Sequence, residues 1–192
     1  MIIILCGKSG SGKDTILNKM KSFGYKPLIS YTTRPIRDGE KDGNEYHFVT
    51  KDTFLQMINN NEFIEHRSYK TKLNGIDDIW YYGLRKENLD KFSTYVVILD
   101  LNGAKSVRDY YGSDNCFICY IDVPDPIRTQ RAESRGSFDK TEWDRRMDAD
   151  SDDFSFEKIG EITNAIAQNC TTVNDCIETI IHKYLDYRKC VP

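Results

Sequence analysis

Residues 7–13 read Gly7-Lys8-Ser9-Gly10-Ser11-Gly12-Lys13 and stand directly behind the apolar run Ile2–Cys6. An apolar helical pattern that includes Ile16 and Met20 follows them. This order of strand, glycine-rich loop and helix is the one that a phosphate site needs. Small residues let backbone N–H groups turn towards a polyphosphate, and the helix adds its positive N-terminal end. The complete G-x-x-x-x-G-K motif favours a nucleotide site over a turn that only caps a helix.

The loop also predicts roles for its last residues. Lys13 can reach the β- and γ-phosphates of a nucleoside triphosphate. The next position, where the motif has Ser or Thr to hold Mg²⁺, is Asp14, and Thr15 lies one step later. The residues expected to contact the triphosphate are Gly7, Lys8, Ser9, Gly10, Ser11, Gly12, Lys13, Asp14 and Thr15.

Composition limits the classes of function. The chain has 192 residues, a formal net charge of −3 and 39% hydrophobic residues, which indicates one globular domain without a basic surface for nucleic acid. The apolar run at the N-terminus is too short for a signal peptide or a membrane span, so we expect a cytoplasmic protein. The six cysteines are then free thiols, and the C-x-x-C spacing of Cys116 and Cys119 has no second pair to form a zinc site.

Alternating strand and helix patterns predict the fold class. The apolar runs Tyr95–Asp100 and Phe117–Asp122 are typical of strands buried on both faces. The expected helices include residues 85–92, 104–111, 126–134, 140–150 and 174–188, and residues 70–79 are expected to form a loop. The result is an α/β, doubly wound parallel sheet, in which ligands lie beyond the carboxyl ends of the strands. Asp100 falls there, as a candidate for holding Mg²⁺ or as a helix cap.

Two further groups of cations are candidates for binding phosphate. Arg34 and Arg37 lie three residues apart in a polar loop near Tyr46, which suits a second phosphate held by bidentate hydrogen bonds. A solvated loop remains the alternative. The later arginines suit a closing flap that stabilises a transferring phosphoryl group, or else a solvated helix face. They are Arg128, Arg131, Arg135, Arg145 and Arg146.

These residues together resemble the guanylate kinase family. Residues 30–49, SYTTRPIRDGEKDGNEYHFV, are similar to its GMP-binding signature. Phe63-Ile64-Glu65, Tyr81-Tyr82-Gly83 and the Arg131-x-x-x-Arg135-Gly136 pattern agree with it, and the similarity extends to about residue 150.

The resemblance implies an ATP-dependent nucleoside monophosphate kinase, which uses Mg²⁺ with ATP and is a monomer or homodimer. It implies a single domain over residues 1–192. The core comprises residues 1–28, 89–128 and 149–192, the monophosphate-binding subdomain about 29–88 and the lid about 129–148. Its partners would be ATP and a nucleoside monophosphate, with no nucleic acid and no membrane.

The resemblance also implies roles residue by residue. Lys13, Arg131, Arg135 and Arg146 would stabilise the transferring phosphoryl group. Glu65 would accept hydrogen bonds from N1–H and N2–H of guanine. Asp14, Thr15 and Asp100 are the Mg²⁺ candidates. The residues implied to bind the acceptor nucleotide are Ser30, Arg34, Arg37, Tyr46, Glu65, Tyr82 and Asp100.

The sequence departs from the family pattern at several positions. Asp14 replaces the usual Mg²⁺-binding residue, Leu84 stands where the family has a hydroxyl that reads guanine O6, and residues 70–79 are extra. The alternatives are therefore a kinase of another nucleotide, or a protein-binding module without turnover. A P-loop GTPase ranks last, because the chain has no Asn-Lys-x-Asp motif.

Overall fold

The computed structural model describes residues 1–73, 76–134 and 138–191. The chain divides into two compact units. The first comprises Met1–Pro27 and Ser93–Pro192, and the second is the continuous segment Leu28–Phe92. Among the described residues, no helix combines the length and the apolar composition that crossing a bilayer requires.

A parallel five-stranded sheet forms the centre of the first unit, in the order β2-β7-β1-β8-β9. Every residue of β1 is buried, as its continuous apolar sequence predicts for a strand covered on both faces. The strands are β1 (Ile2–Cys6), β2 (Lys26–Pro27), β7 (Tyr95–Ile98), β8 (Cys116–Asp122) and β9 (Ala165–Gln168). The prediction of a doubly wound parallel sheet is confirmed.

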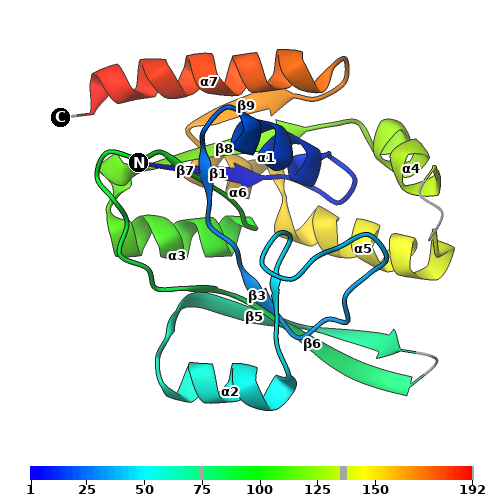
Figure 1. Ribbon diagram of the computed structural model, residues 1–192. Coiled ribbons are helices and arrows are strands. Elements are labelled where there is room, and N and C mark those ends of the chain that lie inside the picture. Colours follow the sequence, from blue (N-terminus) through cyan, green and yellow to red (C-terminus); the bar gives the residue numbers. More distant parts are fainter. Residues whose placement is uncertain (74–75, 135–137, 192) are drawn as a thin grey trace. The chain divides into compact units, whose positions relative to one another are not determined.

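Helices cover both faces of this sheet, with α1 and α7 on one face and α3 and α6 on the other (Figure 1). Ile16 and Met20 of α1 pack with Ile177 and Ile180 of α7 in one buried cluster. The α-helices of the first unit are α1 (Lys13–Ser22), α3 (Leu101–Tyr111), α4 (Asp125–Glu133), α5 (Lys140–Asp153), α6 (Phe156–Ile162) and α7 (Val173–Cys190), and a short 3-10 helix, η1 (Ser113–Asn115), precedes β8.

The second unit contains a four-stranded sheet in the order β4-β3-β6-β5 and one helix. Its helix packs Phe54 and Met57 against Phe63 of the sheet. Thr50 caps the helix by accepting a hydrogen bond from the backbone N–H of Thr53. Its elements are β3 (Tyr31–Thr32), β4 (His47–Phe48), α2 (Lys51–Asn59), β5 (Phe63–Leu73) and β6 (Ile76–Arg85).

Two expectations for the second unit are wrong. The loop expected at residues 70–79 belongs to the long antiparallel strands β5 and β6, although its Asn74-Gly75 pair lies outside the described residues. The helix expected at residues 85–92 is absent from this described segment. Its first residue ends β6, and Lys86 is anchored instead by hydrogen bonds to the carbonyls of Asn61 and Glu62. Cross-strand pairing therefore determines this region, and the helical pattern of its side chains does not.

Candidate active site

The phosphate loop connects β1 to α1 at the carboxyl edge of the parallel sheet. Gly10 and Gly12 have φ of 78° and 87°, in the left-handed region that favours glycine. A Cβ on Gly10 would stand 2.9 Å from the carbonyl oxygen of Arg128, and one on Gly12 would stand 2.6 Å from Nδ2 of Asn169. The conformation and the close packing therefore both require glycine at these positions.

Lys13 lies over its own loop. Its Nζ donates to the carbonyl oxygens of Gly7 at 2.6 Å and Lys8 at 3.0 Å, and to the Ser11 hydroxyl at 3.4 Å. Burial lowers the pKa of Lys13 below its ordinary value of 10.5, and the nearby carboxylates of Asp14 and Asp150 oppose this effect. The ammonium is thus held at the loop by neutral oxygens that negatively charged phosphate oxygens can replace.

A buried ion pair braces the same loop. The Asp150 carboxylate on α5 accepts hydrogen bonds from the backbone N–H of Ser9 at 2.7 Å and from its hydroxyl at 3.3 Å. Nη1 of Arg128 on α4 donates to the Ser9 carbonyl at 2.7 Å and to Asp150 at 3.2 Å. Arg128 is only 1% exposed, so it does not belong to a solvated helix face. Sequence reasoning missed Asp150, because an acidic residue in a polar helix gives no signal of burial.

Arg131 also lies at the phosphate loop. Its Nη2 donates to the carbonyl oxygen of Asn169 at 2.6 Å, and its Nη1 lies 3.5 Å from the carbonyl oxygen of Ser11. Asn169, which sequence reasoning missed, follows β9 and donates from Nδ2 to the Ser11 carbonyl at 2.8 Å. Its position directly after a strand that ends at the sheet's carboxyl edge was the available signal.

Arg146 lies on α5 and is paired with a carboxylate of the same helix. Arg146 donates from Nε to Glu142 at 2.8 Å, and Arg145 binds the same carboxylate through two nitrogens. Burial would raise the pKa of Glu142, but the two arginines outweigh it and lower that pKa to about 2. Arg135 lies outside the described residues.

The candidate Mg²⁺ residues lie on two helix N-termini. Asp14 and Thr15 are exposed on the first turn of α1. Asp100 caps α3, since its Oδ1 accepts a hydrogen bond from the backbone N–H of Gly103 at 2.7 Å. Within the described part of the chain, no three His, Cys, Asp or Glu side chains cluster as a metal site. A carboxylate and a hydroxyl beside a phosphate loop nevertheless fit Mg²⁺, which takes few protein ligands and completes its shell with substrate phosphates and water.

In the second unit, Arg34 is buried and already holds a carboxylate. Its guanidinium donates to both oxygens of Glu40, at 2.8 and 2.9 Å, and lies 5.4 Å from the ring centroid of Tyr46. Burial alone would lower the pKa of Arg34 and raise that of Glu40. The bidentate hydrogen bonds outweigh burial, so the pKa of Arg34 rises and that of Glu40 falls. Arg37 adds its backbone N–H to the same carboxylate at 2.8 Å.

Two of the remaining acceptor-site candidates, Glu65 and Tyr82, lie on the paired strands β5 and β6. Ser30 and Tyr46 directly precede β3 and β4, and Asp100 belongs to the first unit. The rings of Tyr46 and Tyr82 contact each other, with centroids 5.8 Å apart. Ser30 accepts a hydrogen bond from the backbone N–H of His47 at its carbonyl oxygen. Glu65 on β5 stands opposite Leu84 on β6, whose side chain is only 1% exposed. The structure thus places Arg34, Tyr46, Tyr82 and Glu65 in one unit.

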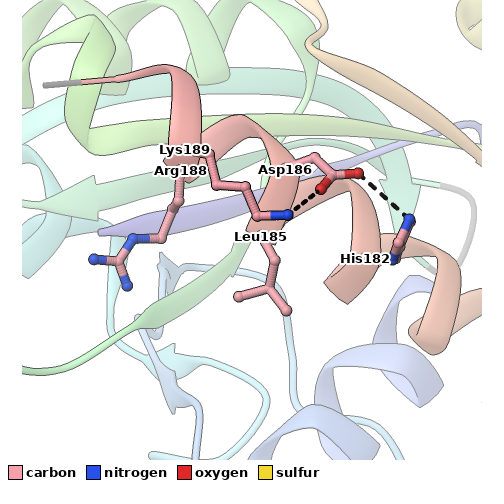
Figure 2. Close-up of a pocket in the computed structure, with 5 residues that line it drawn as sticks. All are labelled: His182, Leu185, Asp186, Arg188 and Lys189. Carbon is pink, nitrogen blue, oxygen red and sulfur yellow. Dashed lines mark hydrogen bonds and ion pairs between the residues drawn. The ribbon is translucent and has the colours of Figure 1, made fainter.

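A shallow hollow of about 370 Å³ lies on α7, and neither the phosphate-loop residues nor the acceptor-site candidates line it. Figure 2 shows its lining residues, which include His182, Asp186 and Lys189. The neighbouring Tyr187 donates to the carbonyl of Ser113, just before β8 begins. The hollow therefore lies at the amino edge of the parallel sheet, opposite the phosphate loop.

Comparison with known proteins places this arrangement in a family. The sequence model of "Guanylate kinase" matches residues 1–184. The chain is 34% identical over 142 residues to a guanylate kinase of Lactobacillus delbrueckii subsp. bulgaricus, a match that covers 71% of this chain and 66% of the relative. It is 32% identical over 163 residues to that of Latilactobacillus sakei subsp. sakei, covering 80% and 74%. For the guanylate kinase of Bacteroides thetaiotaomicron the identity is 39% over 118 residues, covering 58% and 54%.

Solved structures support the fold. The guanylate kinase from Anaplasma phagocytophilum has a TM-score of 0.66 at 21% identity, covering 98% of this chain and 86% of that one. A gluconokinase from Sinorhizobium meliloti has a TM-score of 0.56 at 11% identity, covering 98% and 93%. At these identities the likeness concerns the fold alone.

Proposed function

Because this chain belongs to the guanylate kinase family, we propose that it transfers the γ-phosphoryl group of ATP to a guanine nucleoside monophosphate, GMP or dGMP. The observation that carries the proposal is the phosphate loop, in which left-handed glycines, Lys13 and Arg131 converge at the carboxyl edge of the sheet. In this proposal the core comprises residues 1–28, 89–128 and 149–192, the monophosphate-binding subdomain about 29–88 and the lid about 129–148.

The first unit would bind ATP. Lys13 exchanges the carbonyl oxygens of Gly7 and Lys8 for oxygens of the β- and γ-phosphates. The exchange is favourable because a buried ammonium gains charged partners in place of neutral ones. Arg131, Arg135 and Arg146 stabilise the charge that spreads over the equatorial oxygens during transfer. Asp14, Thr15 and Asp100 are the residues that would hold Mg²⁺, which would neutralise phosphate charge when it is bound with ATP.

The second unit would bind the acceptor. The carboxylate of Glu40 occupies the planar fork of Arg34 in the manner of a phosphate, so the guanidinium is already oriented for an oxyanion. The proposed phosphate site is completed by Arg37, Tyr46 and Tyr82, and Ser30 is a further residue of the acceptor site. Glu65 accepts hydrogen bonds from the guanine base. The reaction needs no covalent intermediate, because an oxygen of the acceptor phosphate attacks the γ-phosphorus in line.

The test is a coupled ADP-release assay with ATP and Mg²⁺ over a panel of ribo- and deoxynucleoside monophosphates. Turnover on GMP or dGMP, with the other bases at background, is the expected result. Turnover on another base would keep the kinase and overturn the guanine assignment. A folded protein without turnover on any acceptor would point to a protein-binding module.

A further inference from the structure

Two oppositely charged side chains share the face of β5 that carries the acceptor-site candidates. Glu65 and Arg67 lie two positions apart on β5, so their side chains are on the same face of the strand. Nη1 of Arg67 lies 3.7 Å from Oε2 of Glu65. Their side chains are 7% and 28% exposed, so the pair is largely removed from solvent, and Nε and Nη1 of Arg67 are themselves buried. A cation and a carboxylate here offer hydrogen-bond donors beside hydrogen-bond acceptors.

A row of ring contacts joins Arg67 to the proposed phosphate site. The guanidinium carbon of Arg67 lies 5.8 Å from the ring centroid of Tyr69, and Tyr69 meets Tyr82 with centroids 5.7 Å apart. Tyr82 contacts Tyr46, which in turn lies against Arg34. Arg67 is also paired directly opposite Tyr82 in the β5–β6 register. Arg67 therefore lies within the proposed acceptor site, beside Glu65, which is the residue proposed to bind the base.

The base edge of guanine presents an acceptor, O6, beside two donors, N1–H and N2–H. Glu65 can accept from the two donors but cannot serve O6, since a carboxylate has no proton to donate. Leu84, directly across from Glu65, is apolar and buried and provides no donor either. A buried base oxygen without a donor would weaken binding considerably.

We propose that Arg67 reads O6 of the acceptor base and, together with Glu65, determines selection of guanine. This inference rests on the proposed function. A guanidinium carries only donors, so it also disfavours adenine, whose amino group at position 6 would meet it donor to donor. Hypoxanthine keeps O6 and N1–H and loses only the N2 contact with Glu65, so IMP should be the next best purine acceptor.

The experiment combines a protein change with a substrate change. We would measure kcat and KM for GMP and for 6-thio-GMP, whose sulfur is a weaker acceptor than O6, in the wild type and in Arg67→Ala. Arg67→Lys tests whether the planar fork is needed in addition to the charge. The matched control is Arg85→Ala, which removes an arginine of the same hairpin that is paired with Glu62 at 3.0 Å.

The expected result is a rise of about 10- to 100-fold in the KM for GMP in Arg67→Ala, with the KM for ATP unchanged. The preference for GMP over 6-thio-GMP should also fall towards one, while Arg85→Ala keeps the wild-type preference. An equal loss on both nucleotides would show that Arg67 only supports the hairpin and would overturn the inference. A wild type that turns over adenine or pyrimidine nucleotides, but no guanine nucleotide, would instead refute the proposed function itself.

Discussion

At the scale of single residues, Lys13 places a buried positive charge at the phosphate loop. The ammonium is desolvated, which lowers its pKa, and its hydrogen-bond partners are carbonyl oxygens of the loop and the Ser11 hydroxyl. Desolvated cations interact strongly with a charge that arrives next to them, because little water must be displaced. In the proposed function, the binding of polyphosphate would recover the energetic cost of burying Lys13.

Lys13→Ala should therefore remove most turnover. The expected loss is about 3–4 kcal/mol of transition-state stabilisation, comparable to the loss of one oxyanion-hole donor. Steady-state kinetics with ATP and GMP would measure it as a fall of about 10²- to 10³-fold in kcat. Near-normal kcat would contradict the assignment of Lys13 to the phosphate site.

At the scale of elements, the ion pair between Arg128 of α4 and Asp150 of α5 supports the phosphate loop, because both side chains bind Ser9. Asp150→Ala should lower the free energy of unfolding by about 3 kcal/mol, because it leaves Arg128 buried with less compensation. It should also raise the KM for ATP through the released Ser9, with the KM for GMP unchanged. Urea denaturation and kinetics would measure the two effects.

The double variant Arg128→Met with Asp150→Ala provides the control for this prediction. It removes both charges, so its loss of unfolding free energy should be smaller than the sum of the losses in Arg128→Met and Asp150→Ala. Additive losses would show that the two residues do not act as a pair. Unchanged ATP kinetics in Asp150→Ala would show that the pair supports the helices but does not position the loop.

Helix α5 also carries a pH-sensitive cluster. The pKa of Glu142 is about 2 in the folded protein, against an ordinary 4.5. A depressed carboxyl pKa contributes stability that is complete above pH 4.5 and is lost as the pH falls towards 2. Solvent screening of this partly exposed site reduces the contribution to about 1 kcal/mol. Glu142→Gln should be less stable than wild type by this amount at pH 7, and the difference should vanish in acid.

Urea denaturation of both proteins between pH 7 and pH 2 would test this prediction. The other carboxylates titrate in both proteins and cancel in the difference. A difference that stays constant over the whole range would mean that Arg145 and Arg146 do not act through the charge of Glu142.

At the scale of the whole molecule, the sequence predicts the sheet better than it predicts the hairpin. Strands β1, β7 and β8 are continuous apolar runs, so the sequence of each strand is enough to predict its burial. The β5–β6 hairpin mixes Lys, Thr and Asp with aromatic residues, and its pairing becomes visible only across the two strands. The same limit applies to the site. The glycine loop is a contiguous motif, whereas Asp150 reaches Ser9 across 141 positions of sequence.

The division into two units predicts that the binding of ATP and the binding of the monophosphate can be weakened separately. Arg34 belongs to the second unit and Lys13 to the first. Arg34→Ala should raise the KM for the monophosphate by about 100-fold, the effect of losing a bidentate charged contact, and leave ATP affinity nearly unchanged. Glu40→Gln is the matched variant, since it keeps Arg34 and removes the carboxylate that competes with phosphate, so acceptor affinity should not fall. Steady-state kinetics would measure the KM values, and isothermal titration with ATP and GMP separately would measure binding at each site. A defect of Arg34→Ala mainly on the ATP side would refute the assignment of the second unit to the acceptor, because no residue of the phosphate loop lies in that segment.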